Sequence, residues 1–269
     1  MTTDRRARRV TGRVPFALFV PAGVGLVFLI LPLAGLLLRA PWSTLFERLS
    51  QPGVLTALRL SLVTASIATV VCVLLGVPLA WLLARLEFPG RKVVRALVTV
   101  PLVLPPVVGG VALLLVFGRR GLVGGWLYET FGVSLPFTTA GVVVAEAFVA
   151  MPFLVIAVEG ALRGADTRYE EAAATLGAGR WTVFRRVTLP LVGPGIAAGA
   201  VLCWARALGE FGATITFAGN FPGRTQTMPL AVYLALEVDL QDAIVLSLIL
   251  LAVSVTILVS LRDKWLTAP

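Results

Sequence analysis

Two ionisable residues, Arg206 and Glu210, lie four residues apart inside an apolar run of the sequence. A spacing of four places both side chains on one face of a helix. Ionisable groups in hydrocarbon are costly unless they pair with each other or face a water-filled cavity. The spacing therefore has two interpretations: an ion pair that locks helices together, or a pathway lining in which Arg206 offers positive potential to an anion. Because an uncompensated buried charge is worse than either, the sequence favours the structural pair.

Other polar residues inside apolar runs could belong to the same pathway. Glu146 lies in the apolar run before the main charged segment and could complement Arg206 or Arg59. Thr214 could line a pore or donate a hydrogen bond back to its own helix. An intramembrane acid is also the expected coupling site of an ion-coupled transporter. These residues are therefore candidates for either a pathway or a structural ion pair.

Catalytic and metal sites are not expected in this chain. The sequence contains no histidine, which removes the commonest general base and the commonest metal ligand. Its two cysteines, Cys72 and Cys203, lie in apolar runs and have the character of small core residues. There is no G-x-x-x-x-G-K-S/T stretch, so the chain cannot bind nucleotide phosphates by the P-loop route. We predict no catalytic residue, no metal and no directly bound cofactor, so any ATP would be used by a separate ATPase subunit.

A charged segment at residues 166–190 separates two apolar runs. Thr167 and Glu170 have the spacing of a capping box, in which two side chains satisfy backbone N–H groups at a helix start. Gly177 is a suitable residue for ending that helix. Pro190 suits the first turn of the following helix. The sequence therefore predicts a short helix, a stop at Gly177, and a second short amphipathic piece that leads into the next span.

The same segment resembles the EAA loop of ABC importer permeases. The matching positions are Glu171, Ala172, Ala173, Gly177, Val187, Leu189 and Pro190. The family usually has Ile where this chain has Val187. The resemblance implies that residues 166–190 form a coupling loop whose helix docks into a groove on a cytoplasmic ATPase. Small residues permit close helix packing, and a projecting aromatic such as Trp181 can fill a pocket on a partner. The alternative is an interfacial amphipathic loop without a partner.

A second resemblance covers the run that contains Arg206 and Glu210. The stretch Ala-Leu-Gly-Glu-Phe-Gly-Ala-Thr at 207–214 is similar to the corresponding part of the molybdate importer permeases. Its Ala-Leu-Gly-Glu-Phe-Gly core is shared with sulfate permeases, so it indicates tetrahedral oxyanions in general. The Thr-Gln-Thr-x-Pro-Leu-Ala segment at 225–231 favours molybdate. The resemblance implies import of molybdate, with tungstate as a further candidate and sulfate or thiosulfate as the alternative.

The composition indicates an all-α integral membrane protein. Charged residues make up 14% of the chain and hydrophobic residues 58%, whereas soluble domains carry about 25% charged residues. Crossing a bilayer as a helix takes about 20 residues. Six apolar runs reach that length, near 14–38, 56–84, 93–117, 139–161, 190–218 and 242–261. We expect the third to be kinked, because Pro101, Pro105 and Pro106 interrupt it.

The basic residues predict the orientation of these spans. If both termini are cytoplasmic, sixteen of the 23 Lys and Arg residues fall in inner segments and five in outer loops. Cytoplasmic segments carry such an excess of positive charge. We therefore predict a basic cytoplasmic tail at 1–13, a single transmembrane permease domain at 14–269, and a cytoplasmic position for residues 166–190, independently of the motif.

The family resemblance also implies a fold, a location and partners. It implies the six-helix fold of type I ABC importer permeases in a bacterial inner membrane. The implied partners are a second permease copy in a homodimer, two cytoplasmic ABC ATPase subunits and an extracytoplasmic solute-binding protein. No nucleic-acid partner is needed, because basic loops beside anionic lipid explain the high positive charge. A protein of a different class, an ion-coupled secondary transporter using Glu146 or Glu210, would work without any ATPase.

Overall fold

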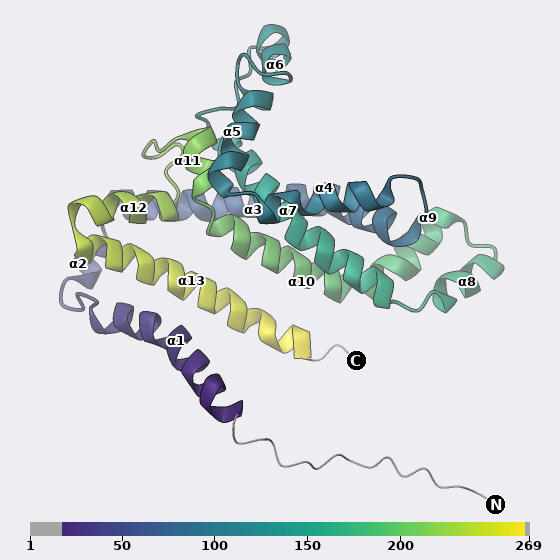
Figure 1. The fold of residues 1–269 in the computed structure, drawn as a ribbon, viewed down its shortest axis with the longest axis horizontal. Helices are drawn as coiled ribbons and strands as arrows, with labels where there is room; N and C mark the ends of the chain where they lie inside the picture. The colour runs from purple at the N-terminus through teal and green to yellow at the C-terminus, as the bar shows by residue number, and fades with distance from the viewer. Residues whose placement is uncertain (1–17, 267–269) are drawn as a thin grey trace, which may run out of the picture.

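A computed structural model describes residues 18–266, and every regular element in that range is a helix. The predicted tail at 1–13 lies outside these residues. Four long helices, α3, α7, α10 and α13, run side by side along the long axis (Figure 1). Helices α8 and α9 lie at one end of this bundle, and α2 and α12 at the other. The helices are α1 (Phe19–Leu38), α2 (Leu45–Leu49), α3 (Pro52–Arg85), α4 (Arg91–Val103), α5 (Pro106–Phe117), α6 (Gly124–Phe131), α7 (Thr139–Gly164), α8 (Arg168–Thr175), α9 (Arg180–Val183), the π-helix η2 (Phe184–Thr188), α10 (Leu189–Leu208), α11 (Gly212–Ala218), α12 (Met228–Val238) and α13 (Leu240–Leu266).

Between residues 18 and 266, five helical segments are long and apolar enough to cross a membrane, and the bent pair α4 and α5 makes a sixth if it counts as one span. The predicted all-α membrane protein is confirmed in this form. The bend is far sharper than a kink, since α4 and α5 meet at 118°. Leu104 and Pro105 are both extended between the two helices. Pro105 and Pro106 also lack the N–H groups that would continue the helix.

The apolar run at 190–218, predicted as one span, is divided into two helices. Helix α10 ends at Leu208 and α11 begins at Gly212, so Glu210 lies in the break between them. A Cβ on Gly212 would lie 2.9 Å from the Cβ of Pro106, so the start of α11 packs closely on the start of α5. The break allows α11 to turn toward α5 instead of continuing the direction of α10 (Figure 1).

Helix α7 is the centre of the bundle, because it packs against both α3 and α10. Small residues permit this close approach. A Cβ on Gly195 of α10 would lie 2.3 Å from the Cβ of Ala161, and one on Gly199 would lie 3.0 Å from that of Ala157. Cys72 and Cys203 are free, fully buried thiols in the same core, as predicted for small core residues.

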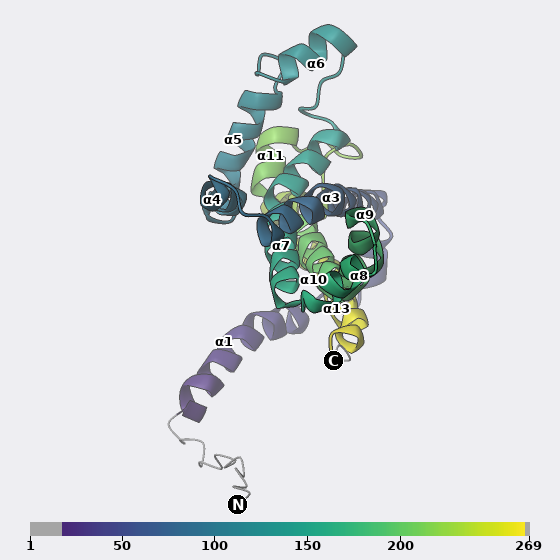
Figure 2. The ribbon, with the colours of Figure 1, turned by 90° about the vertical axis from the view of Figure 1, so that its right-hand side faces the viewer.

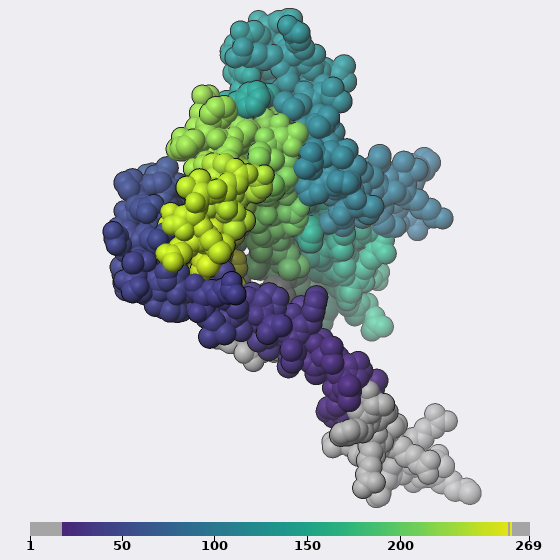
Figure 3. Space-filling model, turned by 60° about the vertical axis from the view of Figure 1, so that its left-hand side comes forward, coloured from purple at the N-terminus to yellow at the C-terminus, as the bar shows by residue number. Residues whose placement is uncertain are grey.

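Two parts stand away from the bundle. Helices α5 and α6 project from its side in two perpendicular views (Figures 1 and 2). Helix α1 leads away from the body of the molecule in the space-filling view (Figure 3), and most of its side chains are exposed. Such apolar surfaces are suited to contact with lipid or with other chains.

Candidate functional site

The segment at 166–190 forms α8, α9 and η2 at one end of the bundle (Figure 1). Helix α8 ends as predicted at Gly177, whose φ of +85° is in the left-handed region that favours glycine. Two hydrogen bonds close the end of the helix. The N–H of Gly177 donates to the carbonyl of Ala174, and that of Ala178 to the carbonyl of Ala173, both at 3.0 Å. This is the Schellman pattern, which fixes the direction in which the chain leaves α8.

The start of α8 differs from the predicted capping box. The side chain of Thr167 makes no capping hydrogen bond. Instead the Asp166 carboxylate accepts from the N–H of Arg168 at 3.0 Å. The carboxylate of Glu170 is turned toward the bundle, where it accepts from Arg85 at 3.0 Å and from Thr188 at 2.9 Å. The prediction was wrong because a basic partner distant in sequence binds Glu170 in place of the local N–H.

The outer face of the 166–190 segment carries large apolar side chains. Leu176 is 88% exposed and Trp181 is 71% exposed. Glu171 and Ala172 are also exposed, whereas Ala173 is half-buried. Leu189 and Pro190, at the end of the segment, are exposed too. Exposed apolar side chains beside a small-residue face are typical of a surface that contacts another molecule.

Aromatic contacts connect this exposed face to the bundle. The Trp181 ring stacks on Phe184 with ring centroids 5.6 Å apart. Phe184 in turn meets Trp81 of α3 edge-on at 6.0 Å. Trp181 is thus held by a ring that is itself fixed to α3, so an exposed aromatic is presented on a supported base.

Pro190 lies in the first turn of α10, as predicted, but the chain is already helical before it, without a break from Arg180 to Leu208. The five residues of η2 come directly before α10, and the N–H of Leu189 donates to the carbonyl of Phe184, five residues back. A proline ring inside an α-helix clashes with the carbonyl four residues earlier. The wider π-turn relieves that clash, which explains how the helix passes Pro190.

An arginine cluster, formed by Arg85, Arg91, Arg95 and Arg163, surrounds the end of α3. Arg91 and Arg95 donate to the carbonyl of Leu83, at 2.9 and 3.3 Å. The Glu159 carboxylate of α7 accepts from Arg95 at 2.6 Å and from Arg163 at 2.7 Å. The cluster joins α3, α4 and α7. Sequence reasoning used these arginines only for orientation, since the spacing gives no sign of their partners.

Arg206 and Glu210 form an ion pair with a closest N–O distance of 2.7 Å. Glu210 is 1% exposed, whereas the side chain of Arg206 is 26% exposed. The other carboxylate oxygen of Glu210 accepts from the N–H of Ala213 at 2.7 Å. Glu210 therefore satisfies an otherwise free N–H at the start of α11 while pairing with the last turn of α10.

Glu146 pairs with neither Arg206 nor Arg59. Its Oε1 accepts from Thr64 of α3 at 2.9 Å, and Oε2 is buried without a hydrogen-bond partner among the described residues. Thr214 is fully buried, and its hydroxyl also has no partner there. The structure thus joins Arg206 to Glu210 and leaves Glu146 in a separate contact with α3.

A second ion cluster lies at the opposite end of the bundle. Arg48 of α2 donates to Asp239 and to Gln241, both at 2.8 Å, and to Asp242. The Arg48 guanidinium, with the N–H of Gln241, lowers the pKa of Asp239 below its usual range. The cluster connects α2 to the start of α13.

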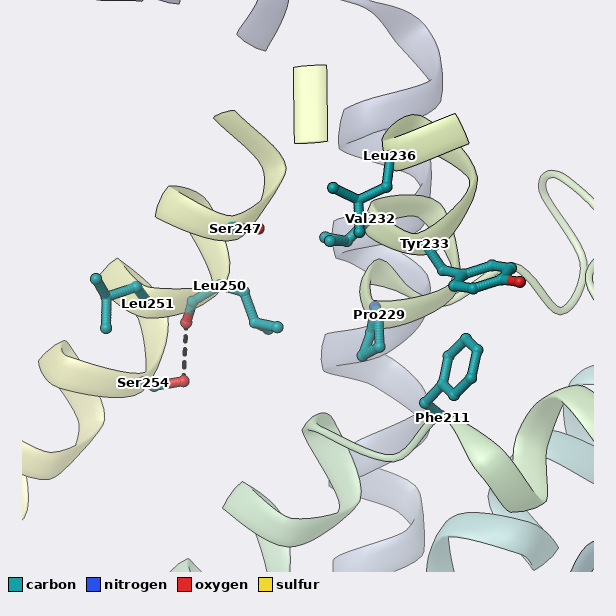
Figure 4. A pocket seen from close by; sticks show the side chains of 9 residues that line it. All are labelled: Phe211, Pro229, Val232, Tyr233, Leu236, Ser247, Leu250, Leu251 and Ser254. Carbon is teal, nitrogen blue, oxygen red and sulfur yellow. Dashed lines mark hydrogen bonds between the residues drawn. The ribbon is translucent and has the colours of Figure 1, made fainter. Parts of the chain in front are cut away.

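A hollow of about 450 Å³ lies between α12, α13 and Phe211 (Figure 4). No lining residue is charged. The hydroxyls of Ser247 and Ser254 donate to carbonyls of their own helix, and the ring of Tyr233 lies against Phe211 at 5.2 Å. An oxyanion needs hydrogen-bond donors or positive charge, so this hollow is not suited to one.

Comparisons with known proteins extend over most of the chain. Residues 73–268 match the family described as binding-protein-dependent transport system inner membrane component. The molybdenum transport system permease protein ModB of Mycobacterium tuberculosis is 49% identical over 251 residues, which are 93% of this chain and 95% of that protein. The sulfate transport system permease protein CysT of Escherichia coli is 37% identical over 248 residues, 89% of each chain. A solved bacterial ABC transporter involved in the import of the acidic polysaccharide alginate has a similar fold, with a TM-score of 0.75, 19% identity, and coverage of 94% of this chain and 96% of that chain.

Proposed function

The chain belongs to the family of binding-protein-dependent transport system inner membrane components, and on this basis we propose that it is the permease subunit of an ATP-driven importer of molybdate. This proposal rests on the 49% identity to a molybdenum permease over 93% of the chain. Identity to a sulfate permease is lower, at 37%. Tungstate is a second substrate to test, because it is a tetrahedral oxyanion of nearly the same size and charge.

The proposed assembly lies in a bacterial inner membrane and contains two copies of this chain. Two cytoplasmic ATPase subunits bind on the side of α8 and α9, and an extracytoplasmic solute-binding protein delivers the anion on the other. The permease itself is not an enzyme, since ATP is bound and hydrolysed by the ATPase. The exposed face around Trp181 supports this assignment, because a supported aromatic is a typical anchor in a partner's pocket.

Transport proceeds by alternating access in this proposal. ATP binding draws the two ATPases together, and α8 of each permease follows. The bundle then switches from inward-open to outward-open, the binding protein releases the anion, and hydrolysis resets the assembly. Glu171, Ala172, Ala173, Gly177, Trp181, Leu189 and Pro190 form the contact surface and its supports.

We assign Arg206 and Glu210 a structural role at the break between α10 and α11. Glu210 is buried and held by two donors, so the pair fixes the position of α11 relative to α10. Thr214 and Glu146 remain pathway candidates, since each carries a buried oxygen without a partner among the described residues. An unpartnered buried oxygen is costly unless water or a ligand reaches it.

Uptake into proteoliposomes tests the proposal. The permease is reconstituted with its ATPase, and the solute-binding protein is added outside. We expect molybdate uptake that requires both ATP and the binding protein, and that excess tungstate inhibits more strongly than excess sulfate. Stronger inhibition by sulfate would favour the sulfate permease alternative. Uptake without ATP that follows an ion gradient would instead establish an ion-coupled secondary transporter.

A further inference from the structure

Glu170 differs from its neighbour Glu171 in the direction it faces. Glu171 is exposed on α8, whereas the side chain of Glu170 is mostly buried beside the end of α3. A single oxygen of Glu170, Oε1, accepts from the Arg85 guanidinium at 3.0 Å and from the Thr188 hydroxyl at 2.9 Å. Hydrogen bonds to an ionised acceptor are about twice as strong as neutral ones. Glu170 therefore bonds to two other helical elements at once.

Both partners of Glu170 are firmly placed. Arg85 is the last residue of α3, and its side chain is mostly buried. Arg91 and Arg95 hold the same end of α3 by donating to the carbonyl of Leu83. Thr188 is almost fully buried at the last position of η2, one residue before α10. The contact therefore runs from α8 to the ends of two helices of the central bundle.

Other links between α8 and the bundle are few. Among the described residues, Arg85–Glu170 is the one ion pair that joins α8 to a long helix of the bundle. The apolar side chains of α8 and the turn after it, such as Tyr169 and Leu176, are exposed. With so little buried surface, α8 is held to the bundle mainly by the hydrogen bonds of its side chains. Those hydrogen bonds therefore determine how α8 moves relative to the bundle.

We propose that Glu170 is a positioning residue that transmits the movement of α8 to α3 through Arg85 and to α10 through Thr188. This inference rests on the proposed function, in which α8 is the helix that an ATPase displaces. When α8 moves, the two hydrogen bonds on Glu170 draw the ends of α3 and α10 with it. The arginine cluster passes the displacement of α3 on to α4 and α7, because Glu159 joins those helices there.

The substitution Glu170→Gln tests this role in the reconstituted complex, with Glu87→Gln as the matched control. Glu87 is an exposed acid just after α3, so its substitution removes the same charge near the same end of the bundle. Two quantities are measured: ATP hydrolysis, and molybdate taken up per ATP hydrolysed. For Glu170→Gln we expect retained hydrolysis and an uptake per ATP that is lower by about fivefold or more, the lower range of typical coupling between sites. Glu87→Gln should match the wild type in both quantities.

Two further variants separate coupling from folding. Thr188→Val removes one of the two hydrogen bonds with little change in shape and should lower uptake per ATP less than Glu170→Gln does. The exchange Arg85→Glu with Glu170→Arg should recover part of the coupling that each single reversal loses. Wild-type uptake per ATP in both Glu170→Gln and Thr188→Val would overturn the inference, as would an equal loss in Glu87→Gln. Absence of ATP-driven uptake in the wild-type complex would instead reject the proposed function.

Discussion

Arg206 and Glu210 pair at 2.7 Å across the point at which α10 stops and α11 begins. The pair occupies a break in a membrane-spanning run, where several backbone N–H groups lose their helical partners. The carboxylate of Glu210 accepts a hydrogen bond from one of them, the N–H of Ala213. The ion pair therefore stabilises the break between α10 and α11.

Replacing Arg206 by Ala should destabilise the protein. The substitution leaves Glu210 buried without its counter-ion, for which a loss of about 3–5 kcal/mol is typical. The yield and thermal stability of the purified complex should fall, while the preference for molybdate over sulfate stays close to wild type. The double variant Arg206→Met with Glu210→Gln should recover stability, since the amide oxygen still accepts from Ala213. A stable Arg206→Ala protein with altered anion preference would assign Arg206 to the pathway.

Replacing Gly177 by Val should disturb the coupling loop without preventing membrane insertion. A Cβ at this position would have no atom within 4 Å, so the cost comes from the φ of +85° alone. Holding a residue other than glycine there costs about 1–3 kcal/mol. Uptake per ATP should fall in Gly177→Val and be largely kept in Gly177→Asn, because Asn tolerates this backbone region. Equal effects of both substitutions would rule out backbone conformation as the cause.

Replacing Trp181 by Ala should weaken binding of the ATPase with little effect on the permease itself. The side chain is 71% exposed, so its removal opens no cavity in the core. Loss of a central aromatic anchor costs about 2 kcal/mol or more, which corresponds to a decrease in affinity of about thirtyfold or more. Titrating the purified permease with ATPase measures the change, and thermal unfolding of the permease alone provides the control. Unchanged affinity would remove Trp181 from the contact surface.

The contact between Arg48 and Asp239 should make stability depend on pH only under acid conditions. The pKa of Asp239 is lower in the folded protein than its ordinary value of 3.8. The stabilisation is therefore fully present above about pH 4 and is lost as the pH falls through the folded pKa. The melting temperature of Asp239→Asn should be below that of the wild type at neutral pH, and the difference should shrink under acid. If the wild type and Asp239→Asn had equal melting temperatures at any pH from 5 to 7, this account would be contradicted.

The sequence predicted features that depend on neighbouring residues. Gly177 ends α8 because a left-handed turn favours glycine wherever the rest of the chain lies. Within the described residues, five of the six apolar runs contain a helix long and apolar enough to cross a bilayer, since length and composition are local properties of the sequence. Glu171, Ala172 and Ala173 were assigned to the coupling loop from a motif that is itself local, and that role stays a prediction.

Features set by distant contacts were missed. Glu170 had the right spacing for a capping box, but Arg85 lies 85 residues earlier and competes for its carboxylate. Glu146 was considered as a partner for Arg206 or Arg59, yet its hydrogen bond is with Thr64, across the interface between α3 and α7. The prolines of the third run predicted a kink, while the 118° turn depends on how α5 packs against α11.

The π-helix η2 has a consequence for the register of everything that follows it. A π-turn contains one residue more than an α-turn at the same point, and each residue rotates a helix by about 100°. The direction in which the Arg206 side chain points is therefore determined by η2, which ends two residues before Pro190. If a single residue were deleted between Phe184 and Thr188, α10 would rotate about its own axis by about 100°. Gly195 and Gly199 would then no longer face α7.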